Sequence, residues 1–206
     1  MKKCPKHCDV VKLIHGTSLK RAENIMKNGF YEITDEKFSD LERGKIGRDM
    51  RENQGGIGEV GVHYFFRQGV DDEYYMANAM FNHGDRVAEK DNSEPAIITF
   101  DACLCNHVTT KQSLDQEWIN GLLDFVKNTY DKEDTRWYLK LKPNENPLQL
   151  FHSLTTDKVG IGRLMSDLNI DAIDEWDDVV VLKNPNKNII EGTMRIIKEG
   201  DVDIKR

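Results

Sequence analysis

The chain has 206 residues, of which 38% are hydrophobic and 32% charged, and its formal net charge is −7. The apolar residues are clustered, which excludes wholesale disorder, and the length fits one domain over residues 1–206. The net negative charge disfavours a general attraction to nucleic acid or to an anionic membrane. No apolar run approaches the roughly 18 residues that span a bilayer.

The N-terminus is basic, but no apolar segment follows its lysines, so we expect no secretory signal. This predicts a cytoplasmic protein, with delivery into a host cell as the alternative. The four cysteines stand in two close pairs, Cys4 with Cys8 and Cys103 with Cys105. In a reducing compartment a disulfide framework is not expected, and we interpret them as ordinary thiols. A zinc site with His7 and His107 as further ligands stays open, although neither spacing is the usual Cys-x-x-Cys.

A short apolar strand is predicted at residues 10–14, and it ends in the triplet His15, Gly16 and Thr17. Thr17 or Ser18 can cap a following helix, which Gly29 is predicted to end. Four apolar residues of that helix recur at helical spacing: Leu19, Ala22, Ile25 and Met26. A histidine, a glycine and two hydroxyls at one strand-to-helix turn suit the binding of a flat amide and a ribose.

Residues 34–60 are polar and carry five glycines without an apolar period, which predicts a long surface loop. We interpret the basic residues at 43–51 as part of this loop rather than as a substrate contact. An aromatic strand is predicted at 61–66, followed by a helix from about residue 71 to Gly84. The next strand, at 96–100, is expected in the centre of a sheet.

The second half of the chain again mixes helices and strands. Ser113 and Gln116 predict a capping box for a helix over residues 114–129. A strand at 137–141 and a helix around Leu164 and Leu168 are expected next. The strand at 179–182 is predicted to pair with 194–197 across an Asn-Pro-Asn turn. Strands in the middle and at the end, with helices early and between them, predict an α+β fold.

Three segments with chemical character follow one another along the chain. The first is His-Gly-Thr, a helix, and Asn28, Gly29 and Phe30. The second is a Gly-x-x-Tyr-Phe strand before a helix rich in tyrosine and alanine. The third is residues 171–173, an acidic turn, an apolar strand, and Asn184-Pro185 with Ile189. In this order they resemble the ADP-ribosyltransferase fold, in its His-Tyr-Glu branch of poly(ADP-ribose) polymerase-like and diphtheria-toxin-like enzymes.

The resemblance implies a split antiparallel sheet with flanking helices, and NAD as the bound nucleotide. It implies that His15 hydrogen-bonds a ribose hydroxyl and that the Gly16 backbone holds the carboxamide, with Thr17 beside them. Tyr64 would stack on the nicotinamide ring. Family members usually have the tyrosine one position earlier, where this chain has His63. Alternate residues of a strand face opposite sides, so one of the two can line the site, and we favour Tyr64.

The resemblance also implies an acid that bonds the ribose 2′-hydroxyl and stabilises positive charge on the sugar. The acidic segment 174–178 offers Asp178 and Asp177 next to the apolar strand, with Glu175 as the alternative. The family usually has glutamate here. The implied activity is NAD-dependent mono-ADP-ribosyl transfer to a protein or nucleic-acid acceptor, as in small toxins and effectors. Two alternatives stay open: an inactive member that binds NAD or a partner, and a tRNA 2′-phosphotransferase-like enzyme.

Overall fold

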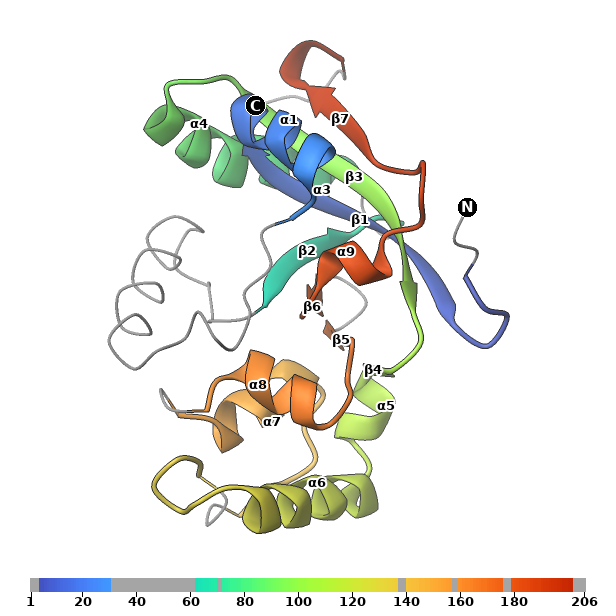
Figure 1. Ribbon diagram of the computed structural model, residues 1–206, viewed down its shortest axis with the longest axis vertical. Coiled ribbons are helices and arrows are strands. Elements are labelled where there is room, and N and C mark those ends of the chain that lie inside the picture. Colours follow the sequence, from blue (N-terminus) through green and yellow to red (C-terminus); the bar gives the residue numbers. More distant parts are fainter. Residues whose placement is uncertain are drawn as a thin grey trace.

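The structure is a computed structural model that describes residues 4–30, 62–69, 72–136, 140–156, 159–175 and 179–201. Within these ranges the fold is α+β, as predicted, with a seven-stranded mixed sheet in the order β4-β5-β6-β2-β1-β3-β7 (Figure 1). Neighbouring strands are antiparallel except for the parallel pair β4 and β5.

The strands are β1 Asp9–Ser18, β2 His63–Arg67, β3 Pro95–Leu104, β4 His107–Val108, β5 Ala172–Glu175, β6 Val179–Leu182 and β7 Arg195–Lys198. The α-helices are α1 Leu19–Asn28, α3 Asp72–Ala77, α4 Asp85–Asp91, α5 Thr110–Ser113, α6 Gln116–Thr129, α7 Pro147–Leu154, α8 Ile161–Asp167 and α9 Pro185–Asn188. A π-helical segment, η2 Asn78–Gly84, joins α3 to α4, and a 3-10 turn, η3 Glu199–Asp201, follows β7. No helix of the described residues has the length and apolar character needed to cross a membrane.

The capped helix and the glycine stop predicted at the N-terminus are confirmed. The predicted strand is present but longer than 10–14: it runs to Ser18, so His15, Gly16 and Thr17 are strand residues and not a turn. β1 pairs with β3 along its whole length, from Asp9 opposite Leu104 to Ser18 opposite Pro95. The Ser18 hydroxyl then accepts a hydrogen bond from the Arg21 backbone N–H at 3.2 Å, which satisfies a free donor at the start of α1. Gly29 ends the helix with φ +80°, a conformation that glycine adopts without strain.

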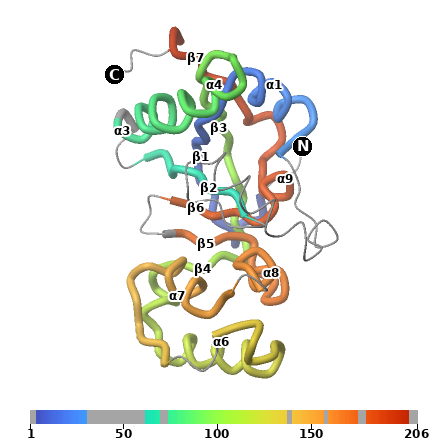
Figure 2. The backbone as a smooth tube through the Cα atoms, turned by 90° about the vertical axis from the view of Figure 1, so that its left-hand side faces the viewer, coloured from blue at the N-terminus to red at the C-terminus, as the bar shows by residue number. Residues whose placement is uncertain are grey.

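The two faces of the sheet are covered by different elements (Figure 2). We call the face covered by α1 the α1 face; Leu13, Phe65 and Phe100 lie on it and pack with Ala22 of α1. On the opposite face, Ile14 and Ile97 pack against η2. The β5–β6 part of that opposite face packs against the helices α6, α7 and α8 through Ile173 and Val181. Figure 1 shows these three helices gathered at the end of the molecule away from α1, α3 and α4.

The helix predicted to stop near Gly84 continues for seven more residues as α4. Gly84 has helical dihedrals, and a Cβ there would lie 3.3 Å from the carbonyl oxygen of Thr17. The glycine therefore permits close packing on β1 rather than a turn. The helical run ends instead at Asn92, which has φ +48°.

The predicted capping box at Ser113 and Gln116 is wrong. Helix α6 begins after Asp115, whose carboxylate accepts hydrogen bonds from the backbone N–H groups of Glu117 and Trp118 at 2.8 and 3.3 Å. A capping box does occur, but four residues earlier, between Thr109 and Gln112 of α5. Ser113 is the last residue of α5, and its hydroxyl donates to the Thr110 carbonyl at 3.0 Å, so the residue directly before α6 that can satisfy its free donors is Asp115.

The predicted hairpin of 179–182 with 194–197 is also wrong. β6 lies between β5 and β2, whereas β7 pairs with β3 at the far edge of the sheet. The Asn-Pro-Asn segment forms helix α9 with proline in its first turn, and this helix carries the chain across to β3. β3 is therefore interior but next to the edge strand, not central. Of the predicted strand at 137–141, residues 137–139 lie outside the described residues and 140–141 are not in a strand. The loop predicted at 34–60 also lies outside them.

Candidate active site

His15 lies near the C-terminal end of β1, half-buried on the α1 face. Its ring centroid is 5.8 Å from that of Phe30 and 5.4 Å from that of Phe65. Burial, with a smaller contribution from the nearby His63, lowers the pKa of His15 from 6.5 to about 4. The imidazole is therefore neutral at physiological pH.

One nitrogen of the neutral His15 ring is hydrogen-bonded within the protein. His15 Nδ1 lies 3.2 Å from the carbonyl oxygen of Tyr64. A carbonyl can only accept, so Nδ1 carries the proton and donates it to this oxygen. The other ring nitrogen, Nε2, then holds a lone pair and can accept a hydrogen bond from a hydroxyl. The structure thus gives His15 a defined tautomer with one acceptor atom.

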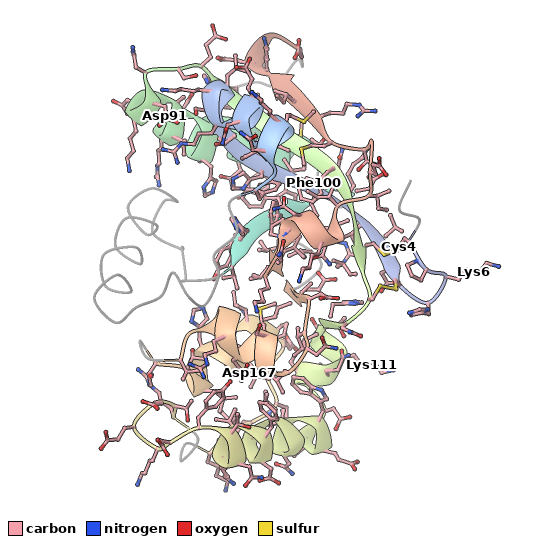
Figure 3. The ribbon with its side chains drawn as sticks, in the orientation of Figure 1. Cys4, Lys6, Asp91, Phe100, Lys111 and Asp167 are labelled. Carbon is pink, nitrogen blue, oxygen red and sulfur yellow. A yellow bond between two sulfur atoms is a disulfide. The ribbon has the colours of Figure 1, made fainter. Side chains whose placement is uncertain are left out.

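His63 shares the aromatic surroundings of His15. Its ring lies 5.7 Å from Phe30 and 6.4 Å from Phe65, and the residue is 7% exposed. Phe65 also contacts Phe100 edge to face at 5.2 Å. We call these five residues the aromatic cluster: His15, Phe30, His63, Phe65 and Phe100. Figure 3 labels Phe100 near the middle of the sheet.

Tyr64 lies on the other side of the sheet from this cluster. Its side chain packs against the apolar residues that β5 and β6 share with α6, α7 and α8. Only its backbone carbonyl reaches His15. Because side chains alternate along β2, His63 and not Tyr64 takes the position beside His15, contrary to the preference drawn from the Tyr-Phe pair.

Gly16 lies where β1 and η2 come close together. A Cβ at this position would lie 1.9 Å from the carbonyl oxygen of Ala79 in η2, on the face opposite His15. The glycine is therefore required for β1 and η2 to approach each other. Thr17 and Ser18 are both buried, at 2% and 0% exposed.

The hydroxyl of Ser18 belongs to a network at the start of α1. It donates a hydrogen bond to Asp91 Oδ2 at 2.6 Å. The Arg21 guanidinium donates two hydrogen bonds to the same carboxylate, at 2.6 and 2.8 Å. The hydrogen bonds from Arg21, opposed in part by burial, lower the pKa of Asp91. Figure 3 shows Asp91 on α4, beside α1. This network fixes α4 to the junction between β1 and α1.

One of the three acids proposed for catalysis is placed by the structure. Glu175 is the last residue of that strand, and its backbone is paired with Val179 of β6. Only the backbone of Glu175 is described, and Asp177 and Asp178 lie outside the described residues. Of the predicted acidic turn 174–178, the structure therefore shows only that Asp174 and Glu175 are the last two residues of β5.

A buried ion pair on the α1 face was not predicted. Arg67 Nη1 lies 2.6 Å from Asp174 Oδ2, and Asp174 is 5% exposed. Arg67 follows His63 and Phe65 at alternate positions of β2, which places all three on one face. That alternation was visible in the sequence, but the pairing of β2 with β6 and of β6 with β5 was not.

The first and third sequence segments meet at Phe30. The Asn186 side chain accepts a hydrogen bond from the Phe30 N–H and donates one to the Phe30 carbonyl, both at 2.8 Å. A Cβ on Gly29 would lie 2.7 Å from Asn186 Oδ1, so the glycine makes room for this contact. Asn186 therefore holds the Phe30 ring against His15 and His63.

The four cysteines form two disulfides, Cys4–Cys103 and Cys8–Cys105. The expectation of ordinary thiols without a disulfide framework is therefore wrong. The physical reason is the long β1–β3 ladder, which ends with Val10 opposite Cys103 and Asp9 opposite Leu104. This pairing brings the turn that carries Cys4 and Cys8 next to Cys103 and Cys105.

Comparisons of the chain with models of protein families, with curated proteins and with solved structures found no match.

Proposed function

We propose that the protein is an NAD-dependent mono-ADP-ribosyltransferase with an ADP-ribosyltransferase-like sheet at its core. The observation that carries the proposal is the placement of the three sequence segments on neighbouring strands. The His-Gly-Thr triplet lies at the end of β1, the aromatic strand is β2, and the apolar strand after the acidic segment is β6. These three strands are adjacent in the sheet, in the order β6-β2-β1.

The distance between β1 and β6 fits a nucleoside that lies across the three strands. Two strand separations of about 4.8 Å place β1 and β6 roughly 10 Å apart. In the proposed complex, His15 Nε2 accepts a hydrogen bond from a ribose hydroxyl, because its Nδ1–H is held by the Tyr64 carbonyl. His63 contributes a second imidazole on the same face.

In the proposed reaction the bond between the nicotinamide nitrogen and the ribose C1′ breaks, and nicotinamide leaves with the bonding electrons. A nucleophile of the protein or nucleic-acid acceptor then bonds to C1′ and loses its proton. A carboxylate stabilises the positive charge that builds up on the sugar. Asp174 is engaged by Arg67, so we assign this role to Glu175, Asp177 or Asp178.

One observation favours a second candidate. His15 and His63 lie on one face of the sheet within a shared aromatic cluster. A histidine in each of these two strands is also the pattern implied by a tRNA 2′-phosphotransferase-like enzyme. Such an enzyme would use NAD to accept a phosphate from the 2′ position of an RNA.

The test is incubation of the purified chain with radiolabelled NAD and a cell lysate, with transfer of label and release of nicotinamide both measured. We expect transfer, and a fall of at least about 100-fold in His15→Ala, because one preorganised hydrogen bond to the reacting sugar is lost. His152→Ala is the matched control, since this exposed histidine lies on α7, whose buried residues pack against the sheet face opposite the cluster. The variants Glu175→Gln, Asp177→Asn and Asp178→Asn identify the acid.

Each further outcome has a defined meaning. NAD-dependent removal of a 2′-phosphate from RNA, without transfer to lysate, would favour the phosphotransferase. Binding of NAD without turnover would favour an inactive member of the fold. Full transfer activity in His15→Ala would refute the site.

A further inference from the structure

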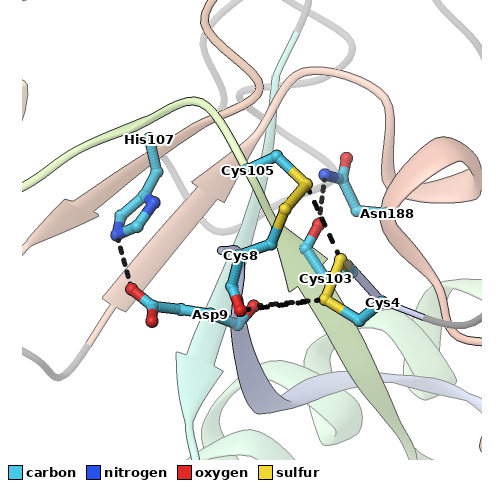
Figure 4. The surroundings of a disulfide bond; sticks show 7 residues. All are labelled: Cys4, Cys8, Asp9, Cys103, Cys105, His107 and Asn188. Carbon is cyan, nitrogen blue, oxygen red and sulfur yellow. Dashed lines mark hydrogen bonds and ion pairs between the residues drawn. A yellow bond between two sulfur atoms is a disulfide. The ribbon is translucent and has the colours of Figure 1, made fainter. Parts of the chain in front are cut away.

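The four cysteine sulfurs converge at the end of the β1–β3 ladder, far from His15. Cys4 and Cys8 flank a turn closed by a 3.0 Å hydrogen bond from the Cys8 N–H to the Pro5 carbonyl. Cys103 and Cys105 flank Leu104 at the end of β3. Figure 4 shows the two pairs facing each other across the ladder.

The two disulfides are neighbours, although their four sulfurs do not all lie within 4.8 Å of one another. The sulfurs of Cys4, Cys8 and Cys103 all lie within 4.8 Å of one another. Cys103 Sγ lies 3.8 Å from Cys105 Sγ, although these two atoms are not bonded to each other. Four thiolates around a tetrahedral zinc ion, with Zn–S bonds of about 2.3 Å, have sulfurs about 3.8 Å apart.

We propose that Cys4, Cys8, Cys103 and Cys105 bind one Zn²⁺ ion when the two disulfides are reduced. Soft thiolates are the ligands that zinc favours in closed structural sites. The backbone that carries them is already held in place, since β1 and β3 pair up to Asp9 and Leu104. Asn188 adds a hydrogen bond of 3.0 Å to the Cys103 carbonyl.

The ligand set is four sulfurs rather than a mixture with His7. The ring of His7 comes within 4.8 Å of the sulfurs of Cys8 and Cys105, but the residue is exposed. His107 is paired with Asp9 at 3.3 Å, so its ring borders the cluster without being needed as a ligand.

The conversion of the disulfide form into the zinc-bound form balances in electrons and protons. Opening both disulfides takes four electrons and four protons, which a thiol or phosphine reductant supplies while it is itself oxidised. Binding of Zn²⁺ then releases the protons of the ligating thiols. Both states fasten the N-terminal segment to β3, so the attachment survives in reducing and in oxidising surroundings. The site lies roughly 20 Å along β1 from His15 and does not rest on the proposed transferase activity.

The experiment measures metal rather than activity. The full chain is reduced with a phosphine, freed of reductant without oxygen, and titrated with Zn²⁺, with bound zinc measured by atomic emission. We expect one zinc per chain, and Co²⁺ in its place should give the intense sulfur-to-cobalt absorption of tetrahedral thiolate sites. Cys4→Ser and Cys103→Ser should each weaken zinc binding at least about 100-fold.

His7→Ala is the matched control, because it changes the same turn without removing a sulfur. It should bind one zinc with an affinity within about threefold of the wild type. Circular dichroism of each variant checks that it is folded, and the cobalt spectrum of the wild type reports the thiolates without any substitution. The proposal is overturned if the reduced wild type binds no zinc, if the cysteine variants bind it as tightly, or if His7→Ala abolishes binding.

Discussion

Substitution of Gly16 by alanine separates two explanations for the glycine in the His-Gly-Thr triplet of β1. The resemblance explains it by contact with a carboxamide, whereas the structure explains it by the packing of β1 against η2. The added Cβ would lie 1.9 Å from the Ala79 carbonyl oxygen and 2.6 Å from its carbonyl carbon. Real Cβ contacts essentially never fall below 3.0 Å, so strand and helix must separate by about 1 Å.

We expect Gly16→Ala to lower the free energy of unfolding by about 3 kcal/mol, the upper end of the range for overpacking. The reason is that the clashing atoms are backbone, and the shift also loosens buried Ile14, Met80 and Ile97. For a chain of this size the melting temperature should fall by about 6–12 °C. Urea titration of the disulfide-bonded protein, followed by circular dichroism, measures the change.

Gly121→Ala is the control, because nothing lies within 4 Å of its added Cβ in the exposed face of α6. This variant should be stabilised by up to about 1 kcal/mol, the difference in helix propensity. If the free energy of unfolding of Gly16→Ala lies within about 0.5 kcal/mol of the wild-type value, the packing explanation is refuted. Loss of NAD binding at unchanged stability would then favour the carboxamide contact.

Three further predictions concern the same region. Arg67→Met should lower the free energy of unfolding, measured by urea titration, by about 3 kcal/mol, because the buried Asp174 carboxylate loses its 2.6 Å ion pair. As a control, the exposed substitution Arg195→Met should change it by less than about 0.5 kcal/mol. Asn186→Ala should cost about 2 kcal/mol by removing both hydrogen bonds to the Phe30 backbone, and an unchanged unfolding midpoint would contradict this. The free energy of unfolding should fall by at most about 3 kcal/mol as the pH is lowered from 6.5 towards 4. The reason is that His15 takes up a proton in the unfolded chain in this range but not in the folded protein. His15→Phe should show a shallower pH dependence in that window, although His83, whose pKa is also lowered by burial, keeps part of it.

Local structure near the N-terminus was predictable because the signals act over a few residues. Ser18 caps α1 and Gly29 ends it through contacts within one helical turn, and both were read directly from the residue types. Short-range signals failed where two of them competed. Ser113 was predicted to cap the helix that Asp115 caps in the structure. Gly84 was predicted to end a helix, but it lies within a continuous helical run and allows that run to pack closely on β1.

The candidate site shows the same division. His15 was identified from its motif, because a histidine at a strand-to-helix turn is a local feature. Its tautomer was not predictable, since it depends on a carbonyl 49 residues away. The choice between His63 and Tyr64 depends on the register of β2, because a shift by one residue moves every side chain to the other face.

The sequence by itself determined the α+β class, the capped helix after His15 and the order of the three segments that suggest NAD chemistry. Only the tertiary structure decided that these segments lie on adjacent strands, that Asn186 holds Phe30 beside the two histidines, and that the four cysteines meet. The physical reason is that strand pairing joins residues far apart in the chain through backbone hydrogen bonds, which leave little trace in side-chain type. The pairing that brings Cys8 to Cys105 is set by the whole β1–β3 ladder and not by the cysteine spacing.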